Sequence, residues 1–196
     1  MSIKLEQKPM EVWYNFLKNF HDKPRFLESS DPISGEIKLS KRELLGLIIY
    51  SYKLDDTGQT KICWDDKDVE PNDGYLELSD DSRIRCEHKI VSQYSTEEDV
   101  ISDILATYSK YAKRGKAYGL NRHLIIHTDR ESKGLLKISR IHDEIKNKCV
   151  FDKVFTVGVN GWEGNNEVVR FSFTEQYPNL GIEHIKINIK TGELLK

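Results

Sequence analysis

The residues from 75 to 91 constrain the fold more than any other part of the chain, because they follow the two-residue period of β-strands. Residues 75–78 alternate as a half-buried strand does, and residues 79–82 are the short polar side chains typical of a turn. Neighbouring side chains of a strand point to opposite faces. The second half of this β-hairpin is therefore predicted to place Ile84, Cys86, His88 and Ile90 on one face and Arg83, Arg85, Glu87 and Lys89 on the other.

The charged face of this hairpin can bring two carboxylates together. Asp73 lies just before the first strand, where the hairpin could place its carboxylate beside Glu87. Converging carboxylates repel unless a cation lies between them, and oxygen ligands suit Mg²⁺ or Mn²⁺. Such an ion polarises a phosphoryl oxygen and lowers the pKa of a bound water, which Lys89 could orient. The pattern predicts metal-assisted hydrolysis of a phosphate ester.

Residues 71–73 (Pro-Asn-Asp) and 87–89 (Glu-His-Lys) resemble the motif of the PD-(D/E)XK nuclease superfamily. In that family an Asp begins one strand and an acid-x-Lys triplet lies on the next. Two positions depart from the motif: Asn72 separates Pro71 from the acid, and His88 stands where the family usually has an apolar residue. The resemblance implies that Asp73 and Glu87 are metal ligands, that the backbone carbonyl of His88 is a third ligand, and that Lys89 positions the water.

Two further acids are candidates for the metal site. Glu70 is close enough to Asp73 in the sequence to be an accessory ligand. In the resembled family a helix before the hairpin sometimes lends an acid, and Glu43 is the candidate here. Ser40-x-x-Glu43 also matches a helix capping box, which explains Glu43 better. The cofactor implied by these oxygen ligands is Mg²⁺ or Mn²⁺.

Helices and strands alternate along the sequence, which predicts an α/β fold with a mixed central sheet flanked by helices. From residue 40 the expected order is a helix, three strands, a helix, a strand, a helix over 132–148 and a strand over 153–159. This order resembles the restriction-endonuclease-like core over roughly residues 40–159. We expect a single domain over 1–196. It has an N-terminal helical segment over 1–39, with a helix over 9–20 and an irregular stretch over 24–39, and a C-terminal β extension over 160–196 that opens with a glycine-rich loop.

The charges of the chain indicate its partner. The net charge is -2, yet the segment from residue 110 to 153 is rich in Lys and Arg. Cations beside an acidic metal centre suit a phosphodiester polymer, because they hold its backbone while the metal acts on one phosphate. We expect the partner to be a nucleic acid, and DNA is favoured over RNA. Formation of a homodimer is left open. The candidate nucleic-acid-binding residues are Lys110, Lys113, Arg114 and Lys116.

No apolar run reaches the length of a membrane span and no signal-peptide pattern opens the chain, so no membrane partner is expected. The three cysteines are isolated, which is typical of free thiols in a reducing cytoplasm. These observations favour a cytoplasmic Mg²⁺-dependent nuclease, most of all a DNA endonuclease. Two alternatives stay open. One is a nuclease-like fold without catalysis that binds nucleic acid or a protein partner, and the other is an interaction protein whose hairpin charges are accidental.

Overall fold

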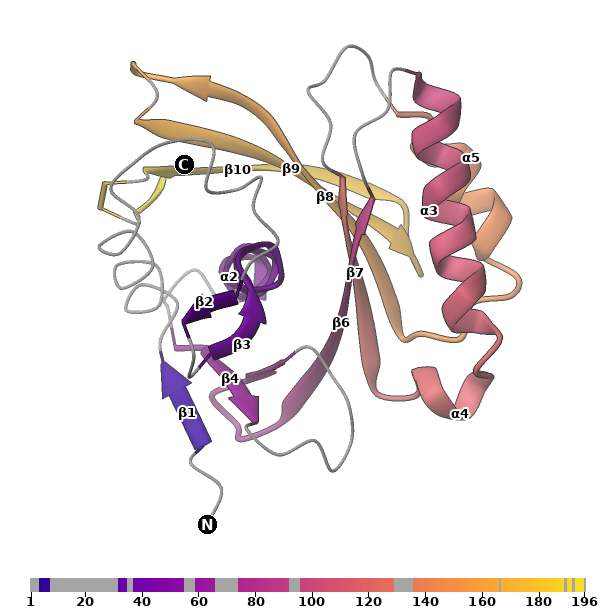
Figure 1. The fold of residues 1–196 in the computed structure, drawn as a ribbon, viewed down its shortest axis with the longest axis horizontal. Helices are drawn as coiled ribbons and strands as arrows, with labels where there is room; N and C mark the ends of the chain where they lie inside the picture. Colours follow the sequence, from indigo (N-terminus) through magenta and orange to yellow (C-terminus); the bar gives the residue numbers. More distant parts are fainter. Residues whose placement is uncertain are drawn as a thin grey trace.

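A computed structural model describes residues 4–7, 32–34, 37–54, 59–65, 74–91, 96–128, 136–165, 167–188, 190–191 and 193–195. Within these residues nine strands form one sheet in the order β1-β4-β5-β6-β7-β8-β9-β10-β11, and β2 pairs with β3 separately (Figure 1). The strands are β1 (Lys4–Gln7), β2 (Pro32–Ser34), β3 (Ile37–Ser40), β4 (Lys61–Asp65), β5 (Tyr75–Glu77), β6 (Arg83–Val91), β7 (Arg122–Thr128), β8 (Lys153–Glu163), β9 (Val168–Tyr177), β10 (Gly181–Asn188) and β11 (Leu194–Leu195).

The sheet is mixed, as the sequence predicts. Strands β4, β5 and β6 are antiparallel neighbours, β6, β7 and β8 run parallel, and β8 to β11 are antiparallel again. Parallel neighbours need crossover connections, which here contain helices. Helices α3 (Glu97–Ala112) and α4 (Lys116–Gly119) lie between β6 and β7, α5 (Ile138–Ile145) lies between β7 and β8, and α2 (Lys41–Leu54) precedes β4.

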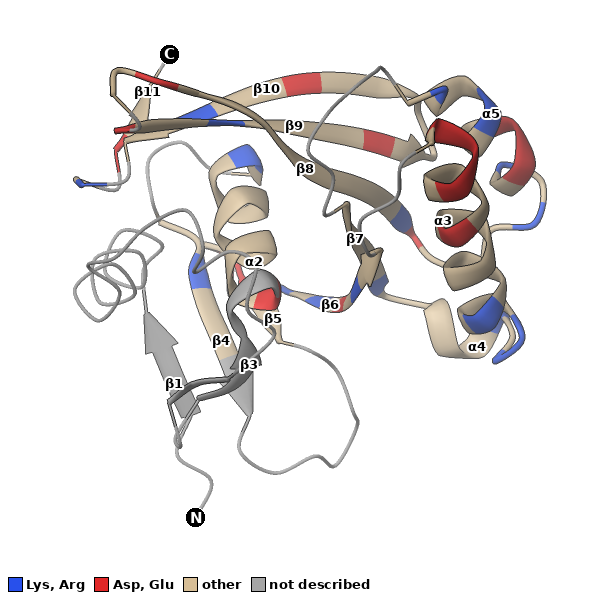
Figure 2. Ribbon diagram, turned by 45° about the horizontal axis from the view of Figure 1, so that its top comes forward, with Lys and Arg blue, Asp and Glu red and all other residues tan. Residues whose placement is uncertain are grey.

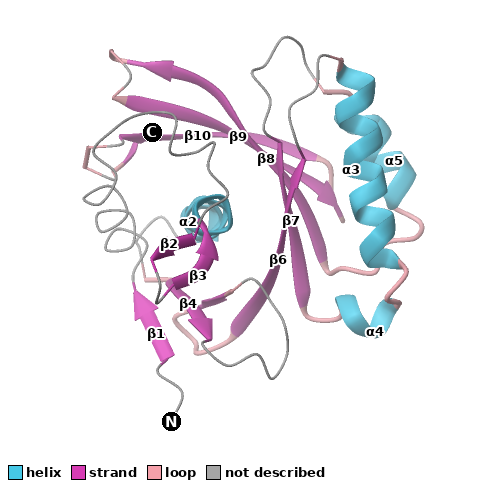
Figure 3. Cartoon of the chain, in the orientation of Figure 1, coloured by secondary structure: helices cyan, strands magenta, loops and turns pink. Residues whose placement is uncertain are grey.

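The sheet curls around α2, and α3, α4 and α5 lie on its other side (Figures 1 and 3). We call the side that holds α2 the concave face and the other side the convex face. Each face has its own apolar core. The concave core includes Leu44, Ile48, Tyr50, Cys86, Ile125, Phe155 and Phe171, and the convex core includes Val91, Ile101, Ile104, Tyr108, Leu124, Ile126 and Ile141.

The predicted hairpin is confirmed. Its turn is closed by Asp80, whose carboxylate oxygen Oδ1 accepts hydrogen bonds from the backbone N–H of Ser82 at 3.0 Å and from the Ser82 hydroxyl at 2.6 Å. Asp81 takes a left-handed conformation with φ 64°, which short polar residues tolerate. The turn therefore fixes the register in which Tyr75 lies opposite Arg85.

The helices before and after the hairpin begin where the sequence predicts. Helix α2 begins directly after Ser40. At the start of α3 the hydroxyl oxygen of Thr96 accepts a hydrogen bond from the backbone N–H of Asp99, and acidic residues fill the first turn. The Thr96 cap therefore fixes the point at which α3 begins.

The helix predicted over residues 132–148 is wrong in length. Residues 129–135 lie outside the described part of the chain, and α5 is helical only from Ile138 to Ile145. Lys137 has a ψ of 73°, which is not helical, and the N–H of Ile138 donates to the carbonyl of Leu136 at 2.8 Å. This tight bend ends the helical periodicity at its N-terminal side.

The glycine-rich loop predicted over residues 160–166 is wrong for most of its length. Strand β8 continues to Glu163, and its pairing with β9 runs from Val154 to Glu163 with two register shifts. Gly161, with a φ of 154°, lies where the register of this pair shifts. A bulge at a glycine lets the ladder continue past a sequence that favours a turn. The C-terminal β residues therefore extend the main sheet.

The N-terminal prediction is corrected in part. The described residues of this segment are strands: β1 pairs with β4, and β2 pairs with β3 within the stretch predicted to be irregular. Short strands that pair with neighbours need no long alternating pattern, so a single sequence shows little sign of them. The helix predicted over residues 9–20 lies outside the described residues.

Candidate functional site

Strand β6 separates the two cores, and its residues alternate between them as predicted. Cys86 and His88 point to the concave face, where α2 approaches very closely. A Cβ atom added at Gly46 of α2 would come within 2.7 Å of the His88 ring nitrogen Nε2. Burial, and next the neighbouring His127, lower the pKa of His88 to about 3, so this ring is neutral. The absence of a side chain at Gly46 therefore allows α2 to pack closely against the concave face of β6.

The convex face of β6 presents Glu87 and Lys89. Glu87 is buried and accepts a hydrogen bond from Arg122, with 2.7 Å between Nη1 and Oε1. Both side chains are largely removed from water, with exposed fractions of 8% for Arg122 and 5% for Glu87. A buried carboxylate needs a partner of opposite charge. The charge of Glu87 is therefore balanced by an arginine from the next strand.

The segment between α3 and β7 delivers Arg122 to this position. Gly115, with a φ of 82°, and Asn121, with a φ of 58°, take left-handed conformations on either side of the short helix α4. Strands β6 and β7 then run parallel with Arg85 opposite Arg122. Because residues two apart on a strand share a face, Arg122 lies diagonally beside Glu87 on the convex face.

Two tyrosines join the cations of this region into one group. The guanidinium of Arg122 lies 4.8 Å from the Tyr118 ring centre, and that of Arg114 lies 4.7 Å from the same ring and 5.3 Å from Tyr111. The Lys89 ammonium lies 5.6 Å from the Tyr111 ring centre. Aromatic faces attract cations and allow like charges to gather. We call Lys89, Tyr111, Arg114, Tyr118 and Arg122 the cation–tyrosine cluster.

The cluster places a net positive charge around the Glu87 carboxylate. Burial, and next the Glu87 carboxylate, raise the pKa of Tyr118 to about 12, so its hydroxyl keeps its proton at neutral pH. Three cations and one carboxylate leave this group with an excess of positive charge. The arrangement is suited to holding an additional anion, such as a phosphate group.

Positive charge also predominates along the rest of this face. The carboxylate of Glu77 is buried between Lys61 and Arg83, each at 3.2 Å. Arg85, two residues before Glu87, is exposed. The described part of the convex face on β4, β5 and β6 therefore combines paired carboxylates with a larger number of cations.

The structure places the predicted nucleic-acid-binding residues next to this cluster. Lys110, Lys113, Arg114 and Lys116 are exposed where α3 ends and α4 begins. Figure 2 shows acidic residues on the first turns of α3 and basic residues at its other end, beside α4. Arg114 joins this exposed basic group to the buried part of the cluster.

Only some of the predicted metal ligands lie among the described residues. Asp73 and Glu70 lie outside the described residues, whereas Glu87, His88 and Lys89 lie within them. Among the described residues no group of three His, Cys, Asp or Glu side chains could hold a metal ion. Glu87 could supply one carboxylate. Glu43 stands in the first turn of α2, and α2 packs on the face opposite to the Glu87 side chain.

The direction of the His88 carbonyl, the third predicted ligand, follows from the hydrogen bonds of β6. The N–H of Cys86 donates to the Gly74 carbonyl at 2.9 Å, so the peptide groups of Cys86 point toward β5. Peptide groups of alternate residues in a strand point to the same side. The carbonyl of His88 therefore points to the β5 side of β6 and away from β7.

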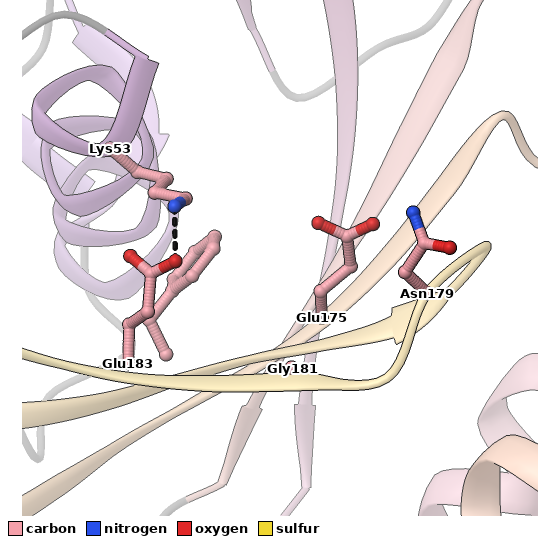
Figure 4. A pocket seen from close by; sticks show the side chains of 6 residues that line it. Lys53, Glu175, Asn179, Gly181 and Glu183 are labelled. Atoms are coloured by element: carbon pink, nitrogen blue, oxygen red, sulfur yellow. Dashed lines mark hydrogen bonds and ion pairs between the residues drawn. The ribbon is translucent and has the colours of Figure 1, made fainter.

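A small pocket lies elsewhere, between the end of α2 and the β9–β10 turn. Figure 4 shows Lys53 reaching to Glu183, with Glu175 and Asn179 on the other side of the hollow. The side chains of Lys53 and Glu183 are 34% and 51% exposed, and such solvent-exposed ion pairs contribute little to the stability of a fold. The buried charges beside β6 are therefore the stronger functional candidate.

The sequence pattern did not single out Arg122 or Tyr118 as neighbours of Glu87. One signal was present: an arginine opens the buried strand β7, at a position where a charged side chain needs a partner. Comparisons of the chain with protein-family models, with curated proteins and with solved structures find no match. Of the described helices, none combines the length and the apolar character needed to cross a membrane.

Proposed function

We propose that this chain hydrolyses phosphodiester bonds in nucleic acid with a divalent metal ion, as a DNA endonuclease of the PD-(D/E)XK type. One observation carries the proposal: the β5–β6 register. Tyr75 lies opposite Arg85 and the N–H of Cys86 donates to the Gly74 carbonyl. If the pairing continued by one residue, position 73 would lie opposite Glu87. Directly opposed residues of an antiparallel pair share a face. Asp73, Glu87 and Lys89 would then face the same side.

The order of the elements supports the same proposal. A helix, three antiparallel strands, a helical connection, a parallel strand, a helix and a further parallel strand follow one another from α2 to β8. The resemblance to the nuclease core proposed from the sequence depends on this order. Fold alone does not define an activity, so the residues of β6 must carry the assignment.

In this proposal the metal is held by Asp73, Glu87 and the His88 carbonyl, with Glu70 as an accessory ligand. A bound Mg²⁺ or Mn²⁺ would supply Lewis-acid chemistry and a water of lowered pKa. Lys89 would orient the water and stabilise negative charge that develops on the phosphate. The aromatic contact of Lys89 with Tyr111 holds its ammonium on the convex face.

The basic surface would hold the polymer. Charge reversal of Lys113, Arg114 and Lys116 together should weaken oligonucleotide binding and flatten its salt dependence, because fewer counterions are then released from the backbone. Binding in EDTA, measured over a range of salt concentrations, checks this independently of cleavage. An unchanged salt slope would assign the binding surface to another part of the protein.

The hydrolytic proposal is tested with supercoiled plasmid and with RNA in Mg²⁺, Mn²⁺ or EDTA. The wild-type protein should nick or linearise the plasmid with either metal and not in EDTA. Glu87→Gln and Lys89→Met should each lower the rate about a hundredfold or more, as loss of a positioned catalytic group does. The acid-x-Lys triplet on and beside α5 provides matched controls: Glu144→Gln and Lys146→Met should cleave like wild type.

One observation favours a second function, a nuclease-like fold that binds nucleic acid without cleaving it. The carboxylate of Glu87 is already engaged by Arg122. If this pair is permanent, the cation–tyrosine cluster is a binding site alone. Oligonucleotide binding in EDTA together with no cleavage in any metal would select this second function.

A further inference from the structure

Leu120 is the most exposed large apolar side chain among the described residues, with an exposed fraction of 63%. It lies directly after α4, beyond the end of α3 on the convex side of the sheet (Figure 1). Leu180 and Ile182 are also exposed, at 40% and 54%. Single exposed leucines are common on protein surfaces, so the surroundings of Leu120 decide whether its position has a function.

The backbone around Leu120 is held in place on both sides. The N–H of Leu120 donates to the carbonyl of Lys116 at 3.2 Å. The preceding residue, Gly119, packs so closely that an added Cβ atom would lie 2.0 Å from the carbonyl oxygen of Val150. Asn121 follows in a left-handed conformation with a φ of 58° and leads the chain into β7. The exposure of Leu120 is therefore a property of the fold.

The side chains before Leu120 in this segment form a basic surface. Lys113 and Arg114 end the connection from α3, Lys116 begins α4, and all three side chains are exposed. Lys116 lies one helical turn before Leu120 and bonds to it through the backbone. Figure 2 shows these basic residues gathered beside α4. Leu120 is therefore an apolar side chain presented next to a group of cations.

This combination matches two different parts of a nucleic acid duplex. Cations bind the phosphates of the backbone, whereas a leucine gains nothing from a phosphate and can pack on the face of a base. Proteins that distort DNA insert apolar side chains between base pairs and partly unstack them, while basic residues hold the flanking phosphates. Unstacking costs least where a base is already mismatched. A duplex with weakened stacking therefore fits this surface best.

We propose that Leu120 is an apolar wedge that enters duplex DNA between two base pairs, and that it gives the protein a preference for duplexes with a mismatch. The inference rests on the proposed function, because it takes duplex DNA as the partner. It adds a division of roles within the contact surface. The cations beside α4 set how strongly the duplex is held, and Leu120 selects the base step that opens.

The test measures binding of the full chain in EDTA to a fluorescein-labelled DNA duplex with one mismatch beside a 2-aminopurine base, and to the same duplex fully paired. Wild type should bind the mismatched duplex more tightly, and the 2-aminopurine emission should rise as the base unstacks. Leu120→Ala should weaken binding to the mismatched duplex about tenfold, because most of the apolar contact is lost, and should abolish the rise in emission. The salt dependence of binding should stay unchanged, because no phosphate contact is removed.

Two further variants separate a wedge from a general loss of apolar surface. Leu120→Phe keeps a large apolar side chain and should retain both the mismatch preference and the rise in emission. Ile182→Ala removes an exposed apolar side chain on β10, beside the carboxylate of Glu183, and should bind like wild type. Leu120→Ala should melt at the wild-type temperature, because substitutions of exposed side chains change stability little.

Equal affinity of wild type and Leu120→Ala for the mismatched duplex would overturn the inference, as would wild type that does not bind DNA. Loss of binding to phosphatidylserine vesicles in Leu120→Ala, with DNA binding unchanged, would overturn it in favour of a lipid surface. These results differ from failure of the proposed hydrolysis. Cleavage of plasmid by wild type and Leu120→Ala alike, with equal DNA affinities, would reject only the wedge. A mismatch preference that depends on Leu120, without cleavage in any metal, would reject only the hydrolysis.

Discussion

Breaking the pair of Glu87 and Arg122 in metal-free buffer should destabilise the protein strongly. Each single variant, Glu87→Gln or Arg122→Met, leaves one buried group without its partner. The side chains are 5% and 8% exposed, so water replaces little of the lost interaction. Removing one partner of a buried pair costs about 3–5 kcal/mol, and for a domain of this size the melting temperature should fall by roughly 6–20 °C.

The double variant, Glu87→Gln with Arg122→Met, should regain much of the loss, because no uncompensated charge remains. Urea unfolding of the four proteins in EDTA gives the interaction free energy as the departure from additivity. Lys146→Ala, which breaks an exposed pair with Asp143, should change stability by less than about 1 kcal/mol. Single variants that each cost under about 1 kcal/mol, or costs that simply add, would refute the view that Arg122 holds this carboxylate.

Two further predictions concern the concave face. Gly46→Ala should lower stability to urea and slow cleavage. The added Cβ would clash with the buried ring of His88. Overpacking costs about 1–3 kcal/mol, whereas the better helix propensity of alanine contributes roughly 1 kcal/mol. A Gly46→Ala variant more stable than wild type would contradict this prediction. Burial lowers the pKa of His123 to about 4. Between about pH 6.5 and pH 4 the unfolded chain therefore binds one proton more than the folded protein, so the free energy of unfolding decreases as the pH is lowered through this range. His123→Gln keeps an acceptor for the Tyr50 hydroxyl and should remove on the order of 3 kcal/mol of that loss, whereas His184→Gln at an exposed site should not.

The parts of the fold with strong local periodicity could be predicted from the sequence. Strand β6 begins and ends at the predicted residues because alternation and a polar turn both define it. Strand β8 was predicted too short because its glycines favour a turn, while pairing with β9 decides the outcome. Tertiary pairing of this kind overrides local propensity and leaves little trace in a single sequence.

The candidate site divides in the same way. That Glu87 and Lys89 share a face follows from a period of two within one strand. The contact between Arg122 and Glu87 depends on the parallel register of β6 and β7. This register brings together residues that lie 35 positions apart, on either side of a helical connection. The shared face of Glu87 and Lys89 was therefore predictable from the sequence, and the contact of Glu87 with Arg122 was not.

Acid-x-Lys triplets recur in this chain, and the structure shows why only strand placement gives one a shared function. On a helix, residues two apart lie about 200° apart around the axis. At the end of α5, Glu144 pairs with a lysine four residues on and Lys146 with an aspartate three residues back, so the two charges act separately. On β6 the same spacing places Glu87 and Lys89 on one face, where Arg122 and a tyrosine ring of α3 hold them. If the β6 face is the reactive one, neutralising the exposed pairs of α5 should leave the cleavage rate unchanged. Neutralising Glu87 or Lys89 should lower that rate about a hundredfold or more.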